Sequence, residues 1–194
     1  MMQRCPLIPM MLAAALMVAD VSGQVLISEV HAGSPDFVEI TNCGATPVDL
    51  SGWMLLSQNG SVAQPTWTWP AGSMLQPGTF LVIEDLGMPG GSGSQPGFIT
   101  TGFNWSWTAD SDIEVLLVGS ALEVDYLYRD GSTVTVAGPY LPGTFSGLLA
   151  GAGDAIQRIA ACVDTDSALD WRIDPATSQT PGSGPATGTL IHIL

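Results

Sequence analysis

The chain has 194 residues, with 18 Asp and Glu against 4 Arg and no Lys, so its formal net charge is −14. Such a charge repels phosphate backbones and anionic lipid head groups, which argues against binding to nucleic acids or to anionic membranes. The partners it favours are cations, basic proteins and neutral polymers. The chain is also 46% hydrophobic with 23 Gly and 14 Pro. This composition is typical of short strands joined by turns, in one domain with appendages, and not of a disordered acidic chain.

The first 23 residues are typical of a secretory signal peptide. Arg4 supplies a positive charge, residues 7–19 form an almost unbroken apolar run, and Val21-Ser22-Gly23 offers the small residues that a signal peptidase recognises. The alternative is a buried or membrane helix, but the run is too short to span a bilayer comfortably. We therefore expect a signal peptide at residues 1–23 and a secreted, extracellular or periplasmic chain.

Removal of the signal peptide leaves two cysteines, Cys43 and Cys162. An even pair in an exported chain predicts a disulfide, and only one intrachain pairing exists. The alternative is two unpaired, small apolar side chains. A disulfide here would close a long loop and constrain the unfolded chain by about 4 to 5 kcal/mol.

Strand-forming residues then follow one another along the chain, separated by turn residues. The predicted strands are residues 24–31, 37–41, 53–56, 66–69, 79–84, 113–118, 122–128 and 155–160, with a short one at 133–136. Gly119-Ser120-Ala121 predicts a hairpin turn. Residues 86–98 and 130–153 are predicted surface loops, and residues 177–189 resemble a linker. No helical period follows the signal peptide, so we expect an antiparallel sandwich or barrel.

The six tryptophans allow two interpretations. Trp53, Trp67, Trp69, Trp105, Trp107 and Trp171 are either ligand-stacking residues or packing residues. We favour packing, because tryptophan buries a large area.

The stretch from Asp36 to Trp53, DFVEITNCGATPVDLSGW, carries the clearest family pattern. Together with Ser28-Glu29-Val30 before it, it resembles the opening of the lamin tail domain (LTD) in the form found in exported bacterial proteins. The similarity continues through Leu75-Gln76-Pro77-Gly78, the strand Thr79 to Glu84, Asn104-Trp105, the hairpin Asp112 to Tyr128, Gln157-Arg158, Asp170-Trp171 and Thr180 to Ser183. The family usually has Asn near the position of Pro185.

This resemblance implies an immunoglobulin-like antiparallel β-sandwich at residues 24–184, followed by a short flexible tail at residues 185–194. The family has no established catalytic residues, so we carry none over. Its members include protein-interaction modules in nuclear lamins and accessory or adhesion-like modules in secreted bacterial proteins. We therefore expect a noncatalytic extracellular module that binds a protein, a cell surface or a glycan. The alternative is a carbohydrate-binding accessory or a small secreted hydrolase.

Neither histidine nor carboxylate patterns indicate catalysis. His31 ends the first predicted strand, and a metal site needs several convergent ligands. Glu29 and Glu39 lie on adjacent predicted strands. A pair of carboxylates can catalyse glycoside hydrolysis, but carboxylates are also common on the solvated face of a sheet. We expect the solvated face, and for Glu39 we also consider backbone hydrogen bonds near the corner at Ser51-Gly52.

Calcium is the one cofactor that the sequence suggests. Asp164, Asp166 and Asp170 place oxygens at relative positions 1, 3 and 7, and Asp110, Asp112 and Glu114 form a second acidic cluster. The first cluster lacks the glycine and glutamate of an EF-hand, so it predicts a loop-borne calcium site or else a plain solvated loop.

The last six residues, Thr189 to Leu194 (TLIHIL), form strands readily. They suggest self-association through a sheet edge. The predicted loops at residues 86–98 and 130–153 are the other candidate partner surfaces. The sequence leaves the oligomeric state open.

Overall fold

The computed structural model describes residues 25–60, 62–86, 97–107, 113–120, 122–129, 154–165, 167–175 and 180–183. The predicted signal peptide, the tail at residues 185–194 and almost all of the two predicted long loops lie outside these residues. The strand predicted at residues 133–136 lies outside them as well. Among the described residues, no helix is long and apolar enough to cross a membrane.

Strands make up nearly all of the regular structure, which confirms the predicted all-β class. They are β1 (Val25–His31), β2 (Phe37–Asn42), β3 (Val48–Asp49), β4 (Met54–Asn59), β5 (Val62–Ala63), β6 (Trp67–Thr68), β7 (Met74–Leu75), β8 (Phe80–Glu84), β9 (Phe98–Thr100), β10 (Ile113–Gly119), β11 (Leu122–Arg129), β12 (Ala155–Arg158) and β13 (Trp171–Asp174). One short 3₁₀ helix, η2 (Ala168–Asp170), precedes β13.

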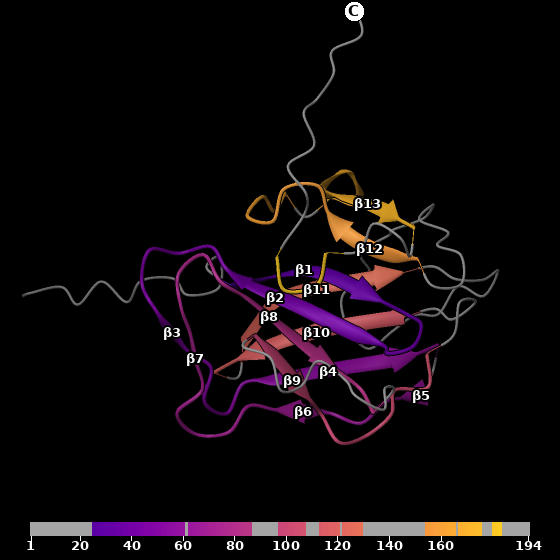
Figure 1. Cartoon of the computed structure of the whole chain (residues 1–194), viewed down its shortest axis with the longest axis horizontal. Coiled ribbons are helices and arrows are strands. Elements are labelled where there is room, and N and C mark those ends of the chain that lie inside the picture. Colours follow the sequence, from indigo (N-terminus) through magenta and orange to yellow (C-terminus); the bar gives the residue numbers. More distant parts are fainter. Residues whose placement is uncertain are drawn as a thin grey trace, which may run out of the picture.

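The strands form two main sheets that pack face to face, as Figure 1 shows. A six-stranded sheet has the order β13-β12-β1-β2-β8-β9 and is antiparallel except for the β8–β9 pair. A five-stranded sheet has the order β11-β10-β4-β5, with β6 also paired to β4. The strands β3 and β7 form a small separate ladder. This arrangement confirms the expected antiparallel sandwich.

The space between the two sheets is filled by aliphatic and indole side chains. The buried core includes Val25, Ile27, Val38, Ile40, Leu55, Ile83, Ile113, Val115, Leu117, Leu127, Ile156 and five of the six tryptophans. Trp67 is half-buried and packs against this core. The rings of Trp105 and Trp107 stack on each other with their centroids 4.7 Å apart. The tryptophans are therefore packing residues, as expected.

A β-bulge in β1 sets which of its side chains face the core. The register pairs Ile27 with Ile40 and then Glu29 with Glu39, so Ser28 is an extra residue on β1. Side chains alternate between the two faces of a strand, and an extra residue shifts that alternation by one. Because of the bulge, Ile27 and Val30 both face the core, while Glu29 and Glu39 stand opposite each other on the outer face of the sheet.

The hairpin predicted at Gly119-Ser120-Ala121 joins β10 to β11, with Ser120 at φ 50°. Gly119 lies against Trp53 so closely that a Cβ atom there would come within 2.6 Å of the indole ring. The corner at Ser51-Gly52 is stabilised locally, because Asp49 Oδ1 accepts hydrogen bonds from the backbone N–H and the hydroxyl of Ser51, each within 2.9 Å. These bonds lower the pKa of Asp49.

Trp105 and Trp107 are buried in residues 102–107, which form no strand. Two details of the sequence interpretation were wrong. The strand β13 and the short strands β3, β5, β7 and β9 were not predicted, because most of them contain two or three residues. The linker-like stretch includes Thr180 to Ser183, which folds into a turn with a hydrogen bond from Ser183 N–H to the Thr180 carbonyl.

Candidate functional site

Among the described residues, Arg158, the last residue of β12, makes polar contacts with several other strands. Its side chain is 1% exposed. Its Nε donates to the Ile27 carbonyl at 2.7 Å, and its Nη2 donates to both carboxylate oxygens of Asp125 at 3.1 and 2.9 Å. Its guanidinium carbon lies 4.3 Å from the centre of the Trp171 ring, a cation–π contact. Arg158 therefore joins β12 to β1, β11 and β13.

Asp125 is the main counter-charge of Arg158 and is also buried. Besides the guanidinium, it accepts hydrogen bonds from the backbone N–H groups of Ile27 and Tyr126, each at 2.7 Å. Burial raises the pKa of Asp125 to about 6, although Arg158 lowers it. The carboxyl is therefore mostly ionised at pH 7, and the two residues form a buried ion pair across the sandwich.

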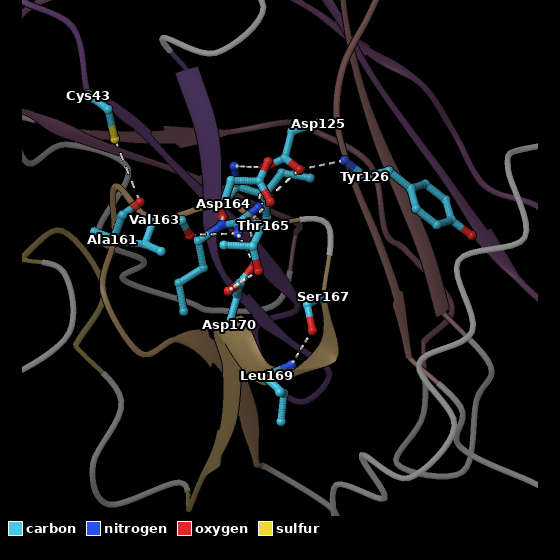
Figure 2. Close-up of polar contacts among 12 residues, drawn as sticks. Cys43, Asp125, Tyr126, Ala161, Val163, Asp164, Thr165, Ser167, Leu169 and Asp170 are labelled. Atoms are coloured by element: carbon cyan, nitrogen blue, oxygen red, sulfur yellow. Dashed lines mark hydrogen bonds and ion pairs between the residues drawn. The ribbon is translucent and has the colours of Figure 1, made fainter.

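The structure places two of the three predicted calcium ligands around the same guanidinium. Figure 2 shows Asp125, Asp164, Thr165 and Asp170 gathered at one point. Asp164 Oδ1 accepts from Arg158 Nη1 at 3.2 Å, and Asp170 Oδ2 lies 3.9 Å from Nη1. The backbone N–H and the hydroxyl of Thr165 both donate to Asp170, at 2.7 to 3.1 Å. In the structure, Asp164 and Asp170 therefore act as counter-charges of Arg158.

The third predicted ligand, Asp166, lies outside the described residues, and so do Asp110 and Asp112. Among the described residues, no group of three or more His, Cys, Asp or Glu side chains is arranged to hold a metal ion. Glu114, the remaining member of the second acidic cluster, is buried. Calcium binding stays a prediction of the sequence.

Cys43 and Cys162 form a disulfide in the structure, with their Cα atoms 5.4 Å apart and 119 positions between them in sequence. The bond ties the turn after β2 to the turn after β12, next to the Arg158 network. Cys43 Sγ also lies 3.6 Å from the Ala161 carbonyl oxygen, a contact drawn in Figure 2. Because a disulfide sulfur carries no proton, this contact is not a hydrogen bond.

A second buried polar group lies on the outer face of the six-stranded sheet. Glu29 and Glu39 face each other across β1 and β2, and both are 0% exposed. Glu29 Oε2 accepts from Gln157 Nε2 at 3.0 Å. Glu39 accepts from the Ser28 hydroxyl at 2.5 Å and from the Gly182 backbone N–H at 2.6 Å. The prediction that these carboxylates lie on a solvated face is therefore wrong.

The cover comes from the distant end of the chain, since Gly182 is 143 positions from Glu39. Burial, and next the charge of Glu39, raise the pKa of Glu29 from 4.5 to about 7. Burial raises the pKa of Glu39 from 4.5 to about 7 as well, against the hydrogen bonds from Ser28 and Gly182. The hypothesis that Glu39 stabilises the corner at Ser51-Gly52 is also wrong, because its hydrogen-bond donors are Ser28 and Gly182.

His31, Asp85 and the two stacked tryptophans also make contacts within the chain. His31 is 5% exposed, and its Nδ1 donates to the Pro35 carbonyl at 2.8 Å. Asp85 accepts from the Asp36 backbone N–H at 3.2 Å, and burial raises the pKa of Asp85. Trp105 and Trp107 are 1% and 5% exposed, so neither offers an open ring face to a sugar.

An open groove of about 500 Å³ lies beside the start of β8 and the turn that precedes it. It is lined by Met74, Leu75, Gln76, Gly78, Thr79, Phe80, Leu81, Gly97 and Gly182. Gly182 lines this groove and also donates its N–H to Glu39. The groove and the carboxyl pair therefore lie next to each other.

Sequence reasoning missed the roles of Arg158, Asp125 and Gln157. One feature of the sequence points to Arg158: it is one of only 4 basic residues, yet it lies inside the apolar run AIQRIA. A charged residue in a buried strand needs a partner. No comparable feature marks Asp125, because Asp125 lies among alternating polar residues of an ordinary-looking strand.

Comparison with known families gives one match. The family model described as Lamin Tail Domain matches residues 19–138, more than half of the chain. No curated protein sequence matches the chain significantly. The strands β12 and β13 lie beyond the matched residues, yet they pair in the same sheet as β1.

Proposed function

Because the chain belongs to the lamin tail domain family, a family of noncatalytic immunoglobulin-like modules, we propose that it is an exported binding or structural module. It binds a protein or another component of the cell surface and catalyses no reaction itself. The observation that carries this proposal is the family match over residues 19–138, which include the strands β1 to β11 of the sandwich. Such modules use loops or sheet edges to bind their partners.

The internal use of the polar residues supports this proposal. In the two buried polar groups, the carboxylates of Asp125, Glu29 and Glu39 accept hydrogen bonds from the chain's own N–H and O–H groups. A general acid or base has to lie within hydrogen-bond reach of a substrate. These three carboxyl groups are buried instead, and their hydrogen bonds lie within the chain.

Export is part of the proposal and rests on the residues of the predicted signal peptide. An extracellular or periplasmic site suits a chain with a disulfide, because thiols stay reduced in the cytosol. The charge of −14 favours a basic or cation-bridged partner surface.

The test is binding of the labelled, oxidised chain, residues 24–194, to intact cells and envelope fractions of the source organism. We expect binding that saturates, that unlabelled chain competes away, and that heat-unfolded chain does not show. Each measurement is made with calcium and again with a chelator, so that a calcium-dependent surface is detected directly.

Two pretreatments of the cells identify the partner. Loss of binding after protease treatment supports a protein partner, whereas loss after periodate oxidation supports the carbohydrate-binding alternative. Consumption of a glycan or phosphoester substrate by the purified chain would support the hydrolase alternative. Binding that never saturates would contradict the interaction module.

A further inference from the structure

The segment Thr180 to Ser183 is held on the outer face of the six-stranded sheet by polar contacts. The Gly182 N–H donates to Glu39 Oε2 at 2.6 Å, and Gln157 Nε2 donates to the Thr180 hydroxyl at 2.5 Å. Gly182 has φ 83° and lies against the Phe98 ring, where a Cβ atom would approach to 3.0 Å. The segment is therefore fitted closely to this face, and Glu39 is its main anchor.

The carboxyl groups beneath the segment are too close to be charged together without cost. Glu29 and Glu39 are register partners, and both are fully buried. Glu29 Oε1 has no hydrogen-bond partner among the described residues. A buried, unpaired carboxylate oxygen next to a second carboxylate favours a proton at this site.

The neighbouring strands supply little compensating charge. On β13, Asp174 adds a third negative charge near Glu29, and Arg172 donates to Asp174 and to the amide oxygen of Gln157. The side chain of Arg172 is 34% exposed. The strand β12 contributes the neutral Gln157, and the segment itself contributes the neutral Thr180. The side-chain hydrogen bond from Gln157 and a backbone hydrogen bond from Thr180 lower the pKa of Glu29, but burial and Glu39 raise it by more.

We propose that Glu29 and Glu39 form a proton-dependent clasp that holds Thr180 to Ser183 on the sheet while the pair keeps a proton. Loss of protons from both carboxyl groups releases the segment. The sandwich beneath stays folded, because its core and its Arg158 network do not include these groups.

The direction of the pH dependence follows from proton linkage. Both groups have a pKa of about 7 in the closed state, above the usual 4.5 that they regain on exposure to water. The open state therefore holds fewer protons, so the clasp is fully stable below pH 4.5 and weakens as the pH rises through 7. Between pH 6 and 8.5 the ratio of closed to open segment falls about tenfold for each carboxyl.

Release of the segment would also change the groove beside it. Gly182 lines this groove together with Met74, Leu75 and Phe80. Release of the clasp would therefore open this groove on the side of Gly182, so the shape of the groove would depend on pH.

Nuclear magnetic resonance of the chain, residues 24–194, tests the clasp. We expect the Gly182 amide to lose at least tenfold of its protection from hydrogen exchange between pH 6 and 8.5, after correction for the intrinsic rate. The amides of β2 are expected to keep their protection over the same range. In the doubly substituted E29Q/E39Q chain, Gln at position 39 still accepts from Gly182, so its protection should not depend on pH.

Three results would each overturn the clasp: constant protection of Gly182 in the parent chain, an equal loss in E29Q/E39Q, or a parallel loss in β2. The carboxyl ¹³C signals of Glu29 and Glu39 give a second measurement that needs no variant. Apparent midpoints near 7 support the clasp, and midpoints near 4.5 exclude it.

Discussion

Replacing Arg158 with methionine is expected to lower the free energy of unfolding by about 3–5 kcal/mol. Methionine fills much of the same volume, but it leaves the buried carboxylate of Asp125 without its ion-pair partner and the Ile27 carbonyl without a donor. Removing one partner of a buried ion pair lowers the free energy of unfolding by more than the intact pair adds to it. The reason is that the remaining buried charge has no counter-charge. Urea unfolding followed by tryptophan fluorescence measures the change.

Arg172 provides the matched control, because it lies on the adjacent strand β13 and pairs with Asp174. Its side chain is 34% exposed, so solvent screens this pair, and Arg172→Met should cost less than about 1 kcal/mol. The double variant R158M/D125L should recover part of the loss, since it removes both charges. Equal costs for R158M and R172M would contradict the role given to Arg158.

Removing the disulfide is the second change with a large expected effect. Replacing Cys43 and Cys162 together with serine is expected to lower the free energy of unfolding by about 2–5 kcal/mol. The bond joins positions 119 residues apart, so its loss frees a long loop in the unfolded chain. The measurement is urea unfolding of the oxidised parent chain and of the double variant.

A reducing agent supplies the control for this experiment. It should bring the parent chain to the midpoint of the serine variant and leave the variant unchanged. Equal midpoints for the oxidised parent and the variant would show that the disulfide does not stabilise the fold, which would contradict the prediction.

Both changes act on the same part of the molecule. The Arg158 network and the disulfide tie the last two strands, β12 and β13, to β1, β2 and β11. These two strands lie at the top of Figure 1, next to β1. They lie outside the residues that the family model matches. The contacts that bind them to the sandwich include those of Arg158, the disulfide, the Gln157–Glu29 hydrogen bond and the β1–β12 ladder.

Alternation of apolar residues predicted the main strands well, because each long strand has one face toward the core. The run TFLVIE predicted β8, and the two runs around Gly119 predicted the β10–β11 hairpin. Family resemblance added the sandwich. The order of strands in each sheet, and the parallel pairing of β8 with β9, depend on contacts between distant segments that no local pattern encodes.

The environment of the charged residues could not be predicted for the same reason. Alternation correctly separates Glu39 from the core-facing Ile40, but it does not say what covers the outer face. Gly182 contacts Glu39 there, and it lies in a stretch whose Gly, Pro and Ser content is typical of a linker. Likewise, two aspartates at the spacing of Asp164 and Asp170 can bind either a calcium ion or a guanidinium group. Only the fold shows that Arg158 lies close to both of them.

The measurement that tests the proposed function most directly is the chemical state of the chain recovered from cells that produce it. An extracellular interaction module has to leave the cytosol and form its disulfide before it binds a partner. Alkylation of free thiols followed by intact-mass analysis of the medium, envelope and cytosol reads both steps. We predict a chain that begins at Gln24, lies outside the cytosol and has neither Cys43 nor Cys162 alkylated. A cytosolic chain that keeps residues 1–23 and carries alkylated cysteines would contradict the account.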